Sequence, residues 1–113
     1  MKDNDTINID KIKIKIIHTP GHTPGAICLH FNNKLITGDT LFVGAIGRTD
    51  LPGGDPVKLF ESLQKLKKLD DKIEIYPGHD YGETKYSTIG NEKKLNPYFM
   101  CNTKEQFLGL VGN

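Results

Sequence analysis

The sequence predicts an α+β fold in which a mixed sheet carries helices on one of its faces. Within residues 11–17, isoleucines alternate with lysines, which is the period of a strand with one wet face. Leu59, Leu63 and Leu66 recur at helical spacing. The predicted order along the chain is three strands, a helix, a strand and two helices. The second face of such a sheet must also be covered.

The first half of the chain is predicted to be strands separated by a fixed loop. The strand over residues 11–17 belongs near the outside of its sheet, because one of its faces is wet. Residues 18–25 read HTPGHTPG, and two Pro-Gly pairs exclude both a helix and a regular strand. Strands over 26–31 and 34–37 are expected to form a hairpin through residues 32–33, since asparagine tolerates left-handed backbone.

A long irregular loop is expected next, because residues 43–55 hold four glycines and a proline. Long loops inside compact domains are usually functional or disordered. Asp55 and Pro56 then begin a helix, with the aspartate as N-cap and the proline at the first helical position.

The last third of the chain is predicted to hold one strand and two short helices. The strand covers residues 73–76 and stops at a Pro-Gly pair. Ser87 or Thr88 is expected to cap a helix that runs through Leu95. A final helix over residues 104–111 begins with a capping box formed by Thr103 and Gln106. All these elements are expected to form a single domain spanning residues 1–113.

Composition predicts a globular cytoplasmic protein. Fifteen basic residues face 14 acidic ones, a net charge of +1, which gives no case for nucleic acid or an anionic membrane as partner. No apolar run approaches the roughly 20 residues of a membrane span, and the polar N-terminus is not a signal peptide. Cys28 and Cys101 form no CxxC pair, which fits a reducing compartment.

Three residues are the strongest candidates for metal ligands. His22 lies in the Pro-Gly loop, Asp39 follows a strand within TGDT, and His79 follows a strand within YPGH. Imidazole and carboxylate groups are ligands that zinc and iron accept. Taken singly, a loop histidine is usually a surface residue and an aspartate in such a turn is usually a cap. His18 is expected to be a structural residue at a strand end, and His30 an ordinary surface histidine.

Several motifs together resemble the metallo-β-lactamase superfamily. TPGHTPG, TGDTLF and YPGH look like its third, fourth and fifth metal motifs. GAIGRTDLPGGD and STIGNEKKLNP are similar to segments of glyoxalase II-like hydrolases and of the related persulfide dioxygenases. The resemblance runs from about Asp5 to Pro97 and implies an αββα sandwich with metals at one edge of the paired sheets.

The resemblance also implies a role for each candidate ligand. His22 would complete the three-histidine set of the first metal, Asp39 would bridge two metals or bind a single iron, and His79 would bind the second metal. One or two zinc ions are implied, with iron as the alternative. The implied reaction is hydrolysis of a small-molecule thioester, and the alternative is a non-haem iron persulfide dioxygenase.

The sequence departs from the family pattern in one respect. The first metal motif, H-x-H-x-D-H, does not occur in the 113 residues. Residues 1–113 are therefore expected to be the C-terminal half of the sandwich, inactive or incomplete alone. A homo-oligomer or a complementing N-terminal half is the expected partner, because an uncovered sheet face exposes aliphatic side chains. A non-catalytic fragment that needs such a partner is the third hypothesis.

Two further residues are candidates for substrate binding. Arg48, in GRTD, either meets a substrate carboxylate or forms an ion pair with Asp50 or Asp55. Tyr81 either lines the pocket or packs structurally. Only 16 residues follow Pro97, too few for the helical region that helps true glyoxalase II bind glutathione. The acyl group is therefore left open.

Overall fold

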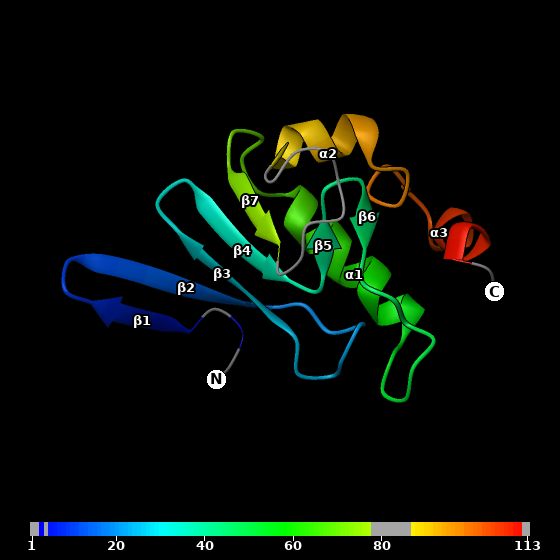
Figure 1. The fold of residues 1–113 in the computed structure, drawn as a ribbon, viewed down its shortest axis with the longest axis horizontal. Coiled ribbons are helices and arrows are strands. Elements are labelled where there is room, and N and C mark those ends of the chain that lie inside the picture. Colours follow the sequence, from blue (N-terminus) through cyan, green and yellow to red (C-terminus); the bar gives the residue numbers. More distant parts are fainter. Residues whose placement is uncertain (1–2, 4, 78–86, 112–113) are drawn as a thin grey trace.

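The structure, a computed structural model, describes residues 3, 5–77 and 87–111 (Figure 1). Its main element is a six-stranded sheet with the order β1-β2-β3-β4-β7-β8. The strands are β1 (Thr6–Ile9), β2 (Ile12–His18), β3 (Ile27–Phe31), β4 (Lys34–Gly38), β7 (Glu74–Pro77) and β8 (Ser87–Thr88). In this sheet β4 and β7 are parallel and the other neighbours antiparallel, so the predicted mixed sheet is confirmed.

The predicted helix starts are all confirmed. The helices are α1 (Pro56–Lys67), α2 (Ile89–Leu95) and α3 (Lys104–Val111). Asp55 Oδ1 accepts hydrogen bonds from the first free backbone amides of α1, at 3.0 and 3.2 Å. Thr88 Oγ1 caps α2 in the same way. Thr103 and Gln106 exchange side-chain-to-backbone hydrogen bonds at the start of α3, which is the expected capping box.

The hydrophobic core lies between the helices and one face of the sheet. Its sheet side is formed by Ile17, Cys28, Leu35 and Ile75, which are cross-strand neighbours or lie on the same face. The helix side is supplied mainly by the leucines of α1, which the 3.6-residue period had identified. The helices therefore cover one face, as predicted.

The opposite face of the sheet is mostly apolar in β1 to β3, and none of the helices of the described residues covers it. Its members lie on the side away from the core, because neighbouring residues of a strand point to opposite faces. Ile14 pairs with Ile7 and Ile12 pairs with Ile9, while Leu29 of β3 pairs with Ile36. We call this the open face, formed by Ile7, Ile9, Ile12, Ile14 and Ile36, of which all but Ile14 are among the exposed large hydrophobic residues.

Several sequence predictions need correction. The loop over residues 43–55 is not wholly irregular, because β6 (Ala45–Ile46) pairs with β5 (Leu41–Phe42) across a two-residue turn at Gly44, φ +76°. The short strands β1 and β8 were not predicted, since four and two residues carry too little periodicity. Asp10, with φ +54°, closes the β1–β2 hairpin. The strand expected at 73–76 lies one residue later. The first half of β2 is exposed on both faces rather than one.

Other predictions concern surroundings rather than elements. Among the described residues no helix is both long and apolar enough to cross a bilayer. Cys28 and Cys101 are both free and buried. His18 is the last residue of β2, at the strand end where it was expected. His30 lies within β3 and is half-buried, whereas it was expected to be an ordinary surface histidine.

Candidate metal site

Three segments meet where β2, β4 and β6 end. His22 lies in the β2–β3 loop, Asp39 follows β4, and Arg48 follows β6. The parallel pairing of β4 and β7 sets Pro77 beside Gly38, so both strands end at the same edge of the sheet. His79 and Tyr81 lie outside the described residues, and their predicted roles stay predictions.

The loop that carries His22 is fixed by helix α1. Gly21 has a φ of +149° and lies so close to Leu59 that a Cβ would overlap the backbone of the helix. The backbone amide of Asp55 donates to the carbonyl of Gly21 at 2.7 Å, and Ser62 Oγ donates to the carbonyl of Pro20 at 2.7 Å. The Pro-Gly pattern therefore does more than break secondary structure, because it lets the loop lie against α1.

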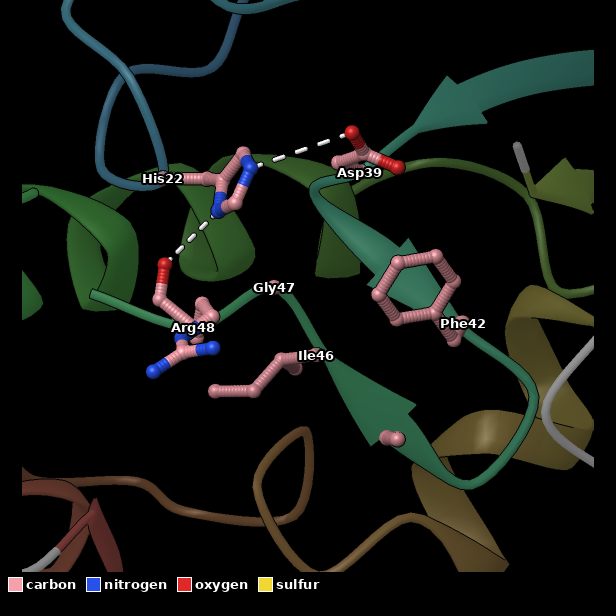
Figure 2. Close-up of a pocket in the computed structure, with 7 residues that line it drawn as sticks. His22, Asp39, Phe42, Ile46, Gly47 and Arg48 are labelled. Carbon is pink, nitrogen blue, oxygen red and sulfur yellow. Dashed lines mark hydrogen bonds and ion pairs between the residues drawn. The ribbon is translucent and has the colours of Figure 1, made fainter. Parts of the chain in front are cut away.

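His22 is held in one orientation by a backbone group. Its Nδ1 lies 2.7 Å from the carbonyl oxygen of Arg48, and its Nε2 lies 3.8 Å from Asp39 Oδ2 (Figure 2). A carbonyl oxygen only accepts, so Nδ1 carries the proton. In the neutral ring this leaves the lone pair of Nε2 directed toward the carboxylate.

Gly47 permits this close arrangement. A Cβ on Gly47 would overlap the carbonyl oxygen of Asp39 and would lie 3.1 Å from the Cβ of His22. The amide of Gly47 donates to the carbonyl of Thr40 at 3.2 Å, which ties the segment after β6 to the turn that holds Asp39. The absence of a side chain at this position brings all three segments into contact.

The donor set fits a metal ion. Nδ1 of a metal-binding histidine usually donates to a carbonyl or carboxylate, while Nε2 binds the ion. Two donors on a tetrahedral ion with bonds of about 2.0–2.2 Å lie about 3.4 Å apart, so His22 Nε2 and Asp39 Oδ2, at 3.8 Å, would have to approach each other only slightly. The described residues nevertheless contain no group of three or more candidate ligands, so they supply two.

Arg48 forms the ion pair expected as one of its two roles. Its Nε and Nη2 donate to the two carboxylate oxygens of Asp50 at 2.7 and 2.8 Å. The hydrogen bonds from Arg48 lower the pKa of Asp50 to about 2. Asp55 is not its partner, because that residue caps α1. Contact between Arg48 and a substrate stays a prediction.

A cavity of about 430 Å³ adjoins the two ligand candidates. Phe42, Ala45 and Ile46 supply its apolar lining beside His22 and Asp39 (Figure 2). These lining residues could not be identified from the sequence, since no periodicity marks a two-residue strand. The carbonyl of Arg48 could not be identified either, because backbone groups are common to every residue and only the fold selects one.

Comparisons with known proteins agree with this geometry. The sequence model of the metallo-beta-lactamase superfamily matches residues 2–79. The hydroxyacylglutathione hydrolase GloC of Haemophilus influenzae is 43% identical over 100 residues, covering 86% of this chain and 45% of GloC. The probable polyketide biosynthesis zinc-dependent hydrolase PksB of Bacillus subtilis is 32% identical over 109 residues, covering 96% of this chain and 48% of PksB.

A solved structure extends the likeness to the backbone. ETHE1 from Myxococcus xanthus superposes with a TM-score of 0.93 and 32% identity, covering 100% of this chain and 51% of ETHE1. The chain thus spans about half the length of these relatives. It matches their C-terminal portion. Since the family match covers more than half of the chain and includes the segments of His22 and Asp39, the chain belongs to the metallo-β-lactamase superfamily.

Proposed function

We propose that this chain supplies part of the metal site of a thioester hydrolase of the glyoxalase II-like kind. The observation that carries the proposal is the orientation of His22, whose Nδ1 is held by the carbonyl of Arg48 while Nε2 faces Asp39. The likeness to the hydrolases GloC and PksB supports hydrolysis, and the name of PksB supports zinc.

Three residues of the chain would hold metal. They are His22 and Asp39, which the structure brings together, and His79, which the motif resemblance adds. A divalent ion bound there supplies Lewis-acid chemistry, which polarises an acyl carbonyl and makes water nucleophilic near neutral pH. His22 would act as a metal ligand and not as an acid or base, because its Nδ1 proton is hydrogen-bonded to the carbonyl of Arg48.

Other residues would bind and orient the substrate. Phe42, Ala45 and Ile46 give the cavity an apolar wall that suits the hydrocarbon part of an acyl group. The guanidinium of Arg48 lies at the rim and is exposed, already paired with Asp50. A substrate carboxylate would therefore have to compete with Asp50 for Arg48. Tyr81, which lies outside the described residues, is proposed as a second substrate-binding residue on the motif resemblance alone.

The test measures thiol release from a panel of acyl thioesters. The chain is mixed with the N-terminal portion of GloC and with zinc, and assayed beside His22→Ala and Asp39→Asn. We expect zinc-dependent release with the unmodified chain and a loss of more than about a hundredfold in both variants. Release that persists in both variants, or no release from the mixture, would overturn the proposal.

The second candidate is a non-haem iron persulfide dioxygenase. It is supported by the GRTD and HDYG segments and by the pairing of His22 with Asp39, two members of a possible two-histidine, one-carboxylate set. To test it, the chain is mixed with the N-terminal portion of GloC as above, but with iron in place of zinc, and oxygen consumption is measured with a persulfide as substrate. Iron retention with oxygen uptake and no thioesterase activity would favour this candidate over the hydrolase.

A third candidate treats the chain as a non-catalytic fragment that acts through a complementing αβ unit. The open face supports it, because Ile9 is 54% exposed and Ile12 is 41% exposed. The occupant we propose is a unit like the N-terminal portion of the relatives, since they are about twice as long as this chain.

The test of this third candidate is binding of the N-terminal portion of GloC, followed by light scattering. Ile36→Lys places a charge on the open face and should weaken the complex at least about tenfold. Leu95→Lys is the matched control, because Leu95 is equally apolar and 67% exposed but lies on α2. A chain that stays monomeric with the added portion, or prefers a homodimer, would contradict the proposed occupant.

A further inference from the structure

Helix α2 places a carboxylate inside the protein beside the β5–β6 hairpin. Glu92 is 1% exposed, and its Oε1 accepts hydrogen bonds from the backbone amide of Gly44 at 2.9 Å and from Asn96 Nδ2 at 2.9 Å. Burying a carboxyl group is costly unless it is hydrogen-bonded. Its partners come from the hairpin and from its own helix, 48 and 4 residues away.

Asn96 completes this connection from the end of the same helix. It is fully buried, and its Nδ2 donates to the carbonyl of Ala45 at 3.0 Å. Its Oδ1 accepts from the backbone amides of Tyr98 and Phe99 at 3.1 and 3.3 Å. The oxygen of the Asn96 side-chain amide therefore fixes the chain after α2, and its nitrogen holds the hairpin.

The hairpin depends on such outside bonds. It consists of two strands of two residues each, which is far below the size of an independently stable hairpin. Glu92 and Asn96 hold the turn and the start of β6, through Gly44 and Ala45. At its other end the hairpin is held by Thr37 Oγ1, which donates to the carbonyl of Leu41 at 2.6 Å.

The segment that follows β6 contacts His22 directly. Ile46 ends the strand, Gly47 packs against Asp39, and the carbonyl of Arg48 accepts from His22 Nδ1. The position of that carbonyl is thus set by where α2 holds the hairpin. Neither Glu92 nor Asn96 lines the cavity beside His22 and Asp39.

We propose that the buried Glu92–Asn96 pair is a positioning element for the metal site, because it holds the β5–β6 hairpin whose outgoing end fixes the His22 imidazole. The importance of this for metal binding rests on the proposed function, but the effect on His22 does not. This assigns a task to the NEKKLN segment, which the proposed chemistry does not use.

The test measures the His22 tautomer in the metal-free chain by imidazole ¹⁵N NMR, together with hydrogen exchange at the Gly44 amide. In Glu92→Leu, which removes the acceptor at similar volume, Gly44 should exchange about tenfold faster or more. The His22 ring should shift toward the tautomer mixture of the urea-unfolded chain. Glu92→Gln keeps an acceptor oxygen and should restore both readouts.

Ile89→Ala is the matched control, since Ile89 is fully buried in the same helix but belongs to the core cluster. An equal tautomer shift in Ile89→Ala at equal loss of stability would overturn the proposal, as would an unchanged His22 in a folded Glu92→Leu. If Glu92→Leu does not fold, Asn96→Asp replaces it, because it removes the Nδ2 donor to Ala45 and to Glu92 and keeps the Oδ1 bonds. A preserved tautomer there contradicts the proposal. A changed tautomer, together with no thiol release from the mixture with the N-terminal portion of GloC, refutes only the proposed function.

Discussion

The ring of His22 and the backbone carbonyl of Arg48 are hydrogen-bonded at 2.7 Å, although 26 residues separate them in the chain. The bond decides which imidazole nitrogen carries a proton and directs the other toward Asp39, 3.8 Å away. A histidine that is pre-oriented in this way loses little freedom when it binds an ion. The relationship depends on a close approach at Gly47, which leads to the first prediction.

Gly47→Ala should be strongly destabilising. Its Cβ would overlap the carbonyl oxygen of Asp39, so the backbone must move. We expect the free energy of unfolding in urea to fall by more than about 2 kcal/mol. The His22 ring should also lose its preference for a proton on Nδ1, which NMR detects.

Gly25→Ala is the control for this prediction, because a Cβ there meets nothing within 4 Å. It should change stability by less than about 0.5 kcal/mol. Similar unfolding curves for the two variants would show that the close packing at Gly47 is not essential.

Arg48→Gln should raise the pKa of Asp50 from about 2 toward its ordinary value of 3.8, because the hydrogen bonds from Arg48 are the main cause of the low value. A lowered folded-state pKa contributes stability above about pH 4, which is lost as the pH falls from 4 to 2. Carboxyl ¹³C NMR follows the titration directly. Arg48→Lys, which keeps the charge without the two-pronged geometry, should give an intermediate pKa.

An unchanged pKa of Asp50 in Arg48→Gln would mean that the ion pair is not formed in solution. Arg48 would then be available to a substrate carboxylate without competition from Asp50.

Cys28 should resist alkylation while the protein is folded. Burial raises the pKa of its thiol to about 11, so only about one molecule in a thousand is a thiolate at pH 8. In the urea-unfolded chain about a quarter would be thiolate at that pH. The chain has two cysteines, so Cys101→Ser leaves Cys28 as the thiol that is labelled. The substitution is needed because burial raises the pKa of Cys101 as well, and Cys101 would also react slowly. Iodoacetamide labelling followed by mass spectrometry gives both rates, and equal rates would exclude a buried thiol.

The 113-residue chain by itself should bind zinc with a dissociation constant weaker than about 1 μM. The described residues bring two donors together, and His79 adds one more only by motif resemblance. Competition with a chromophoric chelator measures the affinity. Stoichiometric binding at or below micromolar concentration that His22→Ala abolishes would prove the prediction wrong. Binding that survives His22→Ala would place the zinc elsewhere.

The local features of this fold were readable from the sequence because short-range rules determine them. Asp55 with Pro56 and Thr103 with Gln106 begin their helices as predicted, since caps act on amides two or three residues away. The Asn-Asn turn formed for the same reason, with Asn32 at φ +51°. The motifs around His22 and Asp39 also indicated the superfamily, which the comparisons confirm.

Only the tertiary structure decided how these pieces act on one another. It selected the carbonyl of Arg48 as the partner of His22, and it paired Arg48 with Asp50 rather than Asp55. It also joined Glu92 to Gly44, 48 residues away. The contacts of His22 and Glu92 each join a side chain to a distant backbone group, and every residue carries such groups, so the sequence does not mark them. For Arg48 the sequence marked two partners, and the fold removed Asp55 by placing it at the start of α1. They are specified by the packing of α1, α2 and the β5–β6 hairpin around one edge of the sheet.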